Sequence, residues 1–185
     1  ILRLLGAKVN REKGTMTIDS SGVARANIPE TLMREMRASV FLMGPLLGRF
    51  RTVRLSYPGG CAIGPRPINL HVKALERLGA VVRESYGHIE AEALRLHGGE
   101  IHLDFPSVGA TENAMMAAVL AEGVTVIRNA AREPEIIDLQ AFLNRMGARV
   151  AGAGTDTLRI EGVPGLSAVE HTVIPDRIEA GTYLV

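Results

Sequence analysis

The sequence feature that most limits the possible folds is a helix ending that occurs three times. In each copy an apolar helical pattern stops at Gly-Ala and continues into a strand-like stretch, in Leu2–Val9, Leu75–Val82 and Phe142–Val150. The Gly-Ala steps lie 73 and 68 residues apart. Glycine commonly ends helices because it adopts left-handed backbone angles without strain. The sequence therefore predicts three helices that each end at this step and lead into a strand.

Two short strands are expected after each Gly-Ala step, because turn-forming residues separate the segments there. The predicted pairs are Lys8–Asn10 with Thr15–Asp19, Val81–Glu84 with Gly87–Ala91, and Arg149–Ala151 with Thr157–Glu161. A second set of segments resembles helix starts, namely Met36–Gly44, Ser107–Met115 and Asp176–Leu184. The first two are expected to continue to about Arg49 and Glu122, before strands at Thr52–Ser56 and Val124–Arg128.

These elements recur in the order α-β-α-β-β with a period of roughly 70 residues, which indicates an α/β fold built from repeated units. We divide the chain into 1–29 as the end of a first unit, 30–102 as a second, 103–174 as a third and 175–185 as the truncated start of the next. The chain is thus expected to be most of one larger domain. Chance similarity among ordinary α/β units is the alternative.

Composition excludes several classes of partner. The net charge is +1, so the sequence lacks the basic excess that nucleic-acid binding favours. No apolar run approaches the ~18–20 residues of a membrane span. A single cysteine cannot form an internal disulfide, which fits a reducing compartment, and a cytoplasmic location is expected.

The only cysteine, Cys61, lies in the loop Tyr57–Pro67, which holds three prolines and three glycines. A lone cysteine is most often a small buried apolar residue. Here the neighbouring glycines allow a ligand close to the backbone, and the Arg66 cation favours the thiolate. These features favour a functional thiol over a structural one.

The sequence gives only weak indications of other catalytic, metal-binding or anion-binding sites. His71 follows the loop on a predicted helix, where an ordinary exposed or half-buried histidine is expected. No CxxC or HExxH spacing indicates a metal, and no Gly-rich nucleotide fingerprint or cofactor motif is present. Arg37 and Ser107 lie at predicted helix starts, which attract anions, although a serine there is most often a plain N-cap.

Taken together, several motifs resemble the UDP-N-acetylglucosamine 1-carboxyvinyltransferases, a family of enolpyruvyl transferases. The motifs run from end to end, and they are Met36–Ser39, Gly44–Leu47, Pro58–Gly64, Arg66–Ile68, Ser107–Asn113, Asn129–Glu135 and Pro175–Thr182. The sister enzyme that acts on shikimate 3-phosphate lacks the Pro-Gly-Gly-Cys loop. The resemblance therefore separates the two activities.

The resemblance implies transfer of the enolpyruvyl group of phosphoenolpyruvate to the 3′-hydroxyl of UDP-N-acetylglucosamine, with release of phosphate, in peptidoglycan synthesis. It also implies repeated βαβαββ units with helices inside and sheets outside, an inside-out α/β barrel of which this chain is a part. Substrates of the family bind between two domains, so a missing second domain of the same protein is the expected partner. No metal, cofactor, nucleic acid or membrane is implied.

Residue roles follow from the same resemblance. Cys61 matches the general acid toward the phosphoenolpyruvate methylene, which can also form a covalent adduct, and Arg66 matches a contact to the phosphoenolpyruvate phosphate. Arg37 and the Ser107 helix start match contacts to the diphosphate, and the run from Arg66 matches the uridine side. The implied substrate-binding residues are Arg37, Arg66, Pro67, Ile68, Asn69, Leu70, Ser107, Val108 and Gly109.

Two positions depart from the family pattern: Asn69 stands where Asp is common, and Phe105-Pro106 stands where some members have a Lys. The family's amino-terminal Lys-Asn pair and its second-domain Asp and Arg have no counterpart here. A non-catalytic module, which binds a nucleotide sugar or serves only as a folding unit, is therefore the alternative to a transferase domain.

Overall fold

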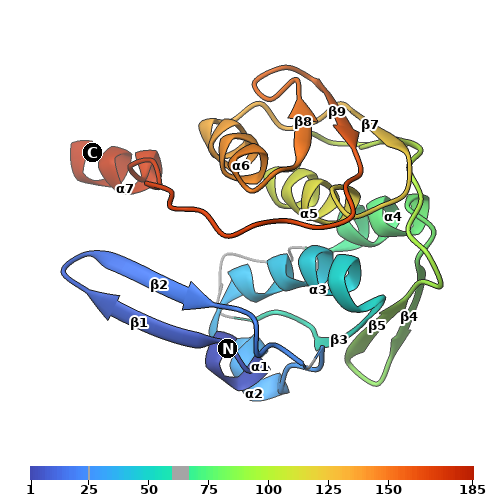
Figure 1. Ribbon diagram of the computed structural model, residues 1–185, viewed down its shortest axis with the longest axis horizontal. Helices are drawn as coiled ribbons and strands as arrows, with labels where there is room; N and C mark the ends of the chain where they lie inside the picture. The colour runs from blue at the N-terminus through green and yellow to red at the C-terminus, as the bar shows by residue number, and fades with distance from the viewer. Residues whose placement is uncertain (25, 60–66) are drawn as a thin grey trace.

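The computed structural model describes residues 1–24, 26–59 and 67–185, and it places helices in an inner layer with three sheets outside them (Figure 1). Cys61 and Arg66 lie outside the described residues. The first segment holds helix α1 (Leu2–Leu5) and the hairpin β1 (Lys8–Glu12) and β2 (Thr15–Asp19). Both faces of this hairpin are largely exposed.

The second segment contains α2 (Glu30–Glu35), a 3₁₀ helix η1 (Arg37–Leu42), α3 (Met43–Phe50), β3 (Thr52–Ser56), α4 (Asn69–Arg77), β4 (Val81–Ser85) and β5 (His88–Glu92). Its strands form an antiparallel sheet in the order β3-β5-β4. Ahead of β3, the chain forms a short parallel bridge in place of a full leading strand. The N–H of Arg54 in β3 donates to the carbonyl of Ala26, and the carbonyl of Arg54 accepts from the N–H of Ile28.

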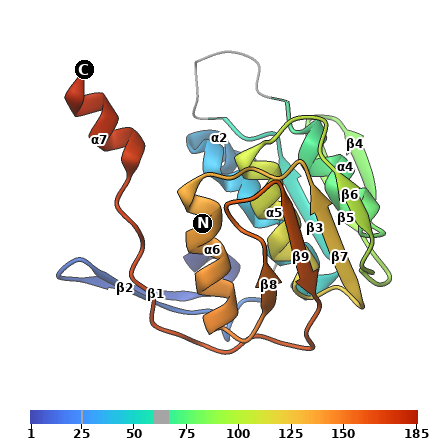
Figure 2. The same cartoon turned by 90° about the horizontal axis from the view of Figure 1, so that it is seen from above.

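The third segment follows the βαβαββ order that the resemblance implies. It contains β6 (Glu100–His102), α5 (Val108–Ala118), β7 (Val124–Arg128), α6 (Pro134–Arg145), β8 (Arg149–Ala151) and β9 (Thr157–Glu161). The sheet order is β6-β7-β9-β8, with β6 parallel to β7. Strand β6 thus joins the sheet of the residues after it. The last helix, α7 (Arg177–Leu184), stands away from the body in both views (Figure 2).

The repeated helix endings are confirmed in atomic detail. Gly6, Gly79 and Gly147 have φ of 111°, 93° and 100°. In every copy the following alanine donates its N–H to the carbonyl five residues back, on Leu2, Leu75 or Leu143. This is the hydrogen-bond pattern of a Schellman ending. Its threefold occurrence supports repeated units over chance similarity.

The prediction of one helix from Met36 to about Arg49 is wrong. The chain forms the 3₁₀ helix η1 first, and α3 begins only at Met43. Pro45 is the reason, because proline lacks an N–H and is tolerated only in the first turn of a helix. Helix α5 also ends at Ala118, earlier than the expected Glu122, and α2 and β6 were not predicted.

Helices α3 and α5 cross at close range in the interior, and this crossing positions the candidate site. The face of α5 toward the core carries small residues, and Ala110, Ala114 and Ala117 are fully buried. At Gly44 of α3, a Cβ atom would overlap the backbone carbonyl oxygen of Asn113 on α5. Only glycine allows this approach. None of the helices in the described ranges is long and apolar enough to span a bilayer.

Candidate functional site

Helix α5 begins with two backbone N–H groups that its own hydrogen bonds leave available. The Ser107 side chain caps the helix by accepting from the N–H of Ala110 at 3.3 Å, and its carbonyl accepts from Thr111 at 3.0 Å. Val108 and Gly109 lie between these positions, where no preceding carbonyl can be an intrahelical acceptor. Their N–H groups, at the positive end of the helix dipole, suit an anion such as phosphate.

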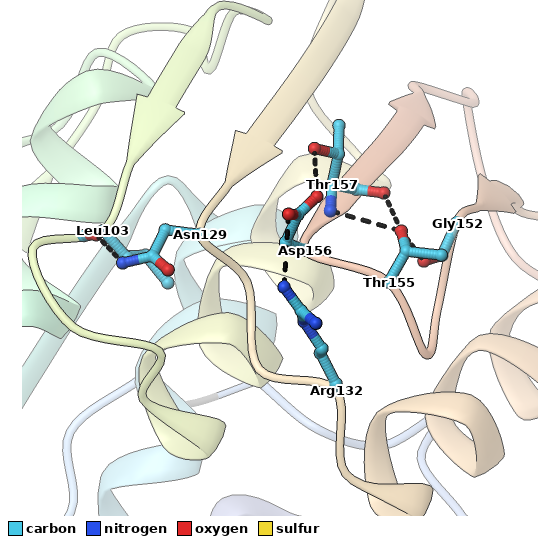
Figure 3. A network of polar contacts seen from close by, with 7 residues as sticks. All are labelled: Leu103, Asn129, Arg132, Gly152, Thr155, Asp156 and Thr157. Atoms are coloured by element: carbon cyan, nitrogen blue, oxygen red, sulfur yellow. Dashed lines mark hydrogen bonds and ion pairs between the residues drawn. The ribbon is translucent and has the colours of Figure 1, made fainter.

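The loop after β7 packs beside the first turn of α5. Asn129 adopts φ of 55° and donates from Nδ2 to the carbonyl of Leu103 at 2.7 Å (Figure 3). In the same view, Arg132 pairs with Asp156 at 3.2 Å between Nη2 and Oδ2. These contacts tie the loop to the residue after the carboxyl end of β6 and to the β8–β9 turn.

Thr111 connects the loop to α5 directly. Its hydroxyl donates to the Ser107 carbonyl at 2.8 Å and accepts the N–H of Ala131 at 3.1 Å. Thr111 is fully buried, so both bonds are shielded from water. The helix start is therefore fixed against the loop. Beside it lies a hollow of about 450 Å³ lined by Pro106, Asn129, Ala130, Arg132 and Glu133.

A buried amide joins three inner helices behind the α5 start. Asn113 is fully buried, accepts the N–H of Gly44 on Oδ1 at 2.8 Å and donates from Nδ2 to the carbonyl of Val40 at 3.0 Å. Its Nδ2 also lies 2.7 Å from Nδ1 of His71 on α4. The amide thereby fixes α4 and α5 against the junction of η1 and α3.

The His71 ring lies against the first turn of α5. A Cβ atom built on Gly109 would be 3.1 Å from Cε1 of His71, 3.4 Å from its Nε2 and 3.2 Å from Phe41. His71 is only 6% exposed. Burial, with a smaller contribution from the Arg37 cation, lowers the pKa of His71 to about 4. The ring is therefore neutral at pH 7.

An acidic residue with a shifted pKa lies one turn further along α5. Burial, followed by the charges of Glu135 and Glu133, raises the pKa of Glu112 to about 7. Glu112 therefore keeps its proton to a higher pH than an exposed glutamate does. Glu135 in turn accepts from Arg177 at 3.0 Å, and its second oxygen is buried without a hydrogen-bond partner among the described residues.

The structure brings part of the predicted site together. Arg37 opens η1 half-buried, at a range where its charge acts on His71, and the half-buried Ser107, Val108 and Gly109 lie at the α5 start. The predicted binding residues just before His71 differ in how exposed they are. Ile68 is buried at 4% exposure and Leu70 is half-buried, whereas Pro67 and Asn69 are exposed.

The predictions for Cys61 and Arg66 lie outside the described residues. His71 was misjudged, because it is buried rather than exposed or half-buried. Asn113 was not recognised as part of the site. A signal was available, since Asn113 follows Gly109 by four residues and so lies on the same helix face. Within residues 1–24, 26–59 and 67–185 no cluster of ligands suits a metal ion.

A larger groove of about 1120 Å³ lies elsewhere, among α1, α3, α5, α6 and the segment after β9. Its lining is mainly aliphatic, with Leu2, Leu42, Leu46, Met116, Leu139 and Val163 among the contributors. Such a surface suits apolar packing rather than an anion. The α5 start is therefore the better candidate for a phosphate-bearing ligand.

Sequence comparison gives one family and close relatives. The family model described as EPSP synthase (3-phosphoshikimate 1-carboxyvinyltransferase) matches residues 1–185. The chain is 63% identical to UDP-N-acetylglucosamine 1-carboxyvinyltransferase 1 of Symbiobacterium thermophilum, over all of this chain and 43% of that protein. It is 58% identical to UDP-N-acetylglucosamine 1-carboxyvinyltransferase 2 of Caldanaerobacter subterraneus subsp. tengcongensis, over 44% of that protein. The chain thus spans less than half of these relatives.

Solved structures give the same fold. The enolpyruvyl transferase NikO from Streptomyces tendae superposes with a TM-score of 0.85 at 26% identity, over all of this chain and 44% of that one. An EPSP synthase from Acinetobacter baumannii superposes with a TM-score of 0.68 at 20% identity, over 89% of this chain and 38% of that one. The inside-out α/β architecture is thereby confirmed.

Proposed function

The chain belongs to the EPSP synthase family, and on this premise we propose that it is the nucleotide-sugar-binding part of a UDP-N-acetylglucosamine 1-carboxyvinyltransferase. Identity of 55–63% to six proteins of that name supports this substrate over shikimate 3-phosphate. The Pro-Gly-Gly-Cys loop in the sequence supports the same choice.

One structural observation carries the proposal: the α5 start presents two N–H groups in a place where the charge of Arg37 also acts. A diphosphate requires such a combination, because backbone donors fix its oxygens and a guanidinium balances its charge. The exposed Asn69, at the first turn of α4, is then available to the uridine side.

The reaction proposed for the whole protein is addition followed by elimination. The sugar 3′-oxygen forms a bond to C2 of phosphoenolpyruvate while an acid delivers a proton to C3. Loss of a proton from C3 and cleavage of the C2–O bond then release phosphate. Cys61 is the proposed acid, since a thiol titrates close enough to neutrality to give and regain a proton.

The second domain of the relatives supplies the remaining partner in this proposal. The base for the sugar hydroxyl and a further arginine for phosphoenolpyruvate are assigned to it by the resemblance. We therefore expect the chain alone to bind UDP-N-acetylglucosamine but not to turn it over, because positioning of both reactants contributes as much as ~7–11 kcal/mol to such a transfer. The product would enter peptidoglycan synthesis in the cytoplasm.

Calorimetric titration with UDP-N-acetylglucosamine tests the binding role. Arg37→Ala should weaken binding by roughly tenfold to a hundredfold, since hydrogen bonds to charged groups contribute ~1.5–3 kcal/mol. Arg145→Ala is the matched control, because Arg145 is an exposed arginine in the last turn of α6. Equal affinities of the two variants would contradict the assignment. Absence of any binding by the parent chain would favour the folding-unit alternative.

A phosphate-release assay tests the catalytic part. The 185-residue chain should release no phosphate from phosphoenolpyruvate and UDP-N-acetylglucosamine. The same residues joined to the remainder of a full-length relative should do so, and Cys61→Ala in that protein should abolish release. Sustained turnover by the 185-residue chain would show that the second domain is not required.

A further inference from the structure

The hydrogen bonds of Asn113 determine how its side-chain amide is oriented. The N–H of Gly44 can only donate, so the amide atom 2.8 Å from it must be the oxygen. The carbonyl of Val40 can only accept, so the atom 3.0 Å from it must be the NH₂ group. Two independent backbone groups thus exclude the flipped amide.

This orientation determines the tautomer of His71. The NH₂ group of Asn113 has one hydrogen left after its bond to Val40, and it points to Nδ1 of His71 at 2.7 Å. Nδ1 must accept this bond and therefore carries no proton. A neutral imidazole has one N–H, which must then be on Nε2.

The Nε2 edge of the ring lies at the start of α5. A Cβ atom built on Gly109 would be 3.4 Å from Nε2 and 3.1 Å from the adjacent Cε1. His71 is 6% exposed, and the one hydrogen bond of its side chain within the described residues is the bond between Nδ1 and Asn113. An oxyanion bound at the α5 start could accept a hydrogen bond from this N–H, and hydrogen bonds to charged acceptors are among the stronger ones in proteins.

We propose that Asn113 holds His71 in the tautomer that carries its proton on Nε2. That N–H is a third donor, beside the two free amides at the α5 start, to a phosphate oxygen of the nucleotide sugar. Asn113 is a positioning residue in this arrangement, since it acts only through the ring. The donor role rests on the proposed function, whereas the tautomer follows from the protein alone.

Nitrogen NMR of the ¹⁵N-histidine-labelled protein tests the tautomer without a ligand. The signals of His71 are identified among the five histidines by their loss in His71→Phe. Nδ1 should show the shift of an unprotonated nitrogen and Nε2 that of a protonated one. In Asn113→Asp the side chain can only accept, so Nδ1 should become protonated. A protonated Nδ1 in the parent protein would overturn the tautomer assignment.

Titration with UDP-N-acetylglucosamine, and separately with inorganic pyrophosphate, tests the donor. Both should move the Nε2 signal of His71, and His71→Phe should weaken binding of the nucleotide sugar by at least about tenfold. His71→Gln, which keeps an N–H near the Nε2 position, should restore part of that loss. An unmoved Nε2 signal at saturation, or unchanged affinity in His71→Phe, would overturn the donor role. A parent protein that binds neither compound would overturn the proposed function as well, while the tautomer result would stand.

Discussion

The crossing of α3 and α5 gives a prediction with an internal control. Gly44 and Gly48 lie four residues apart on α3, and both face α5. A Cβ atom at Gly44 would overlap the Asn113 carbonyl oxygen and lie 2.9 Å from its Oδ1. A Cβ atom at Gly48 would lie 3.4 Å from Cδ1 of Leu120, an ordinary van der Waals contact. The two alanine variants therefore add the same methyl group to different surroundings.

The two variants should change the free energy of unfolding in different directions. In Gly44→Ala, overpacking against backbone costs ~1–3 kcal/mol and separation of Gly44 from Asn113 leaves a buried amide oxygen unpaired at ~1–3 kcal/mol. The alanine regains at most ~1 kcal/mol of helix propensity. The net loss in the free energy of unfolding is about 3 kcal/mol. In Gly48→Ala only the propensity gain remains, so stability should be unchanged or rise by up to ~1 kcal/mol.

Urea denaturation followed by circular dichroism measures both variants against the parent protein. Gly44→Ala should shift the midpoint down with little change in slope, and Gly48→Ala should not. Binding of UDP-N-acetylglucosamine should also weaken in Gly44→Ala, because Asn113 and the ring it holds would move. Equal stabilities of the two variants would refute the view that α3 and α5 are in backbone contact at Gly44.

Three further outcomes are expected. Cys61 should be alkylated by a small epoxide phosphonate of the fosfomycin type, as mass spectrometry would detect, whereas Cys61→Asp should keep an acid but resist alkylation; an equally sensitive Cys61→Asp would exclude this target. Because burial and the neighbouring Glu135 and Glu133 raise the pKa of Glu112 from 4.5 to about 7, the folded state binds the extra proton, and stability should fall as pH rises across that interval. Glu112→Gln should flatten the fall in urea midpoints between pH 5 and 8, and an unchanged slope would assign it to other groups. Gly109→Ala should weaken UDP-N-acetylglucosamine binding more than it lowers stability, because its Cβ would press on the His71 ring at 3.1 Å; unchanged calorimetric affinity would contradict this.

The parts of the fold that local chemistry determines were predictable from the sequence. The strands Thr52–Ser56, Val124–Arg128 and Thr157–Glu161 have the predicted bounds, and the three Gly-Ala endings have the predicted geometry. These features depend on residues close together in the chain. Strand β6 was missed for the opposite reason, since three residues form a strand only because β7 pairs with them.

The break between η1 and α3 was also readable in principle. Pro45 limits where an α-helix can begin, and the apolar pattern of Met36–Arg49 obscured this limit. The apolar character of the segment does agree with its burial, because Val40, Met43 and Leu47 all lie in the core. Burial and backbone conformation are thus separate predictions, and a single pattern can give one without the other.

The candidate site was predictable only in part, and the family resemblance rather than physical chemistry supplied that part. Ser107 and its neighbours were recognisable as a helix start, but an N-cap alone does not distinguish a ligand site from ordinary capping. The distinction depends on Asn113, which lies 42 residues from His71 and 69 from Gly44. The pairing with Gly44 follows from the repeat, because α3 and α5 hold the same place in successive units, whereas the pairing with His71 depends on how α4 packs against α5. The glycine that permits the crossing and the amide that spans it therefore act as one arrangement: the close approach at Gly44 places Asn113 within reach of the ring, and the ring then directs its remaining N–H to the α5 start.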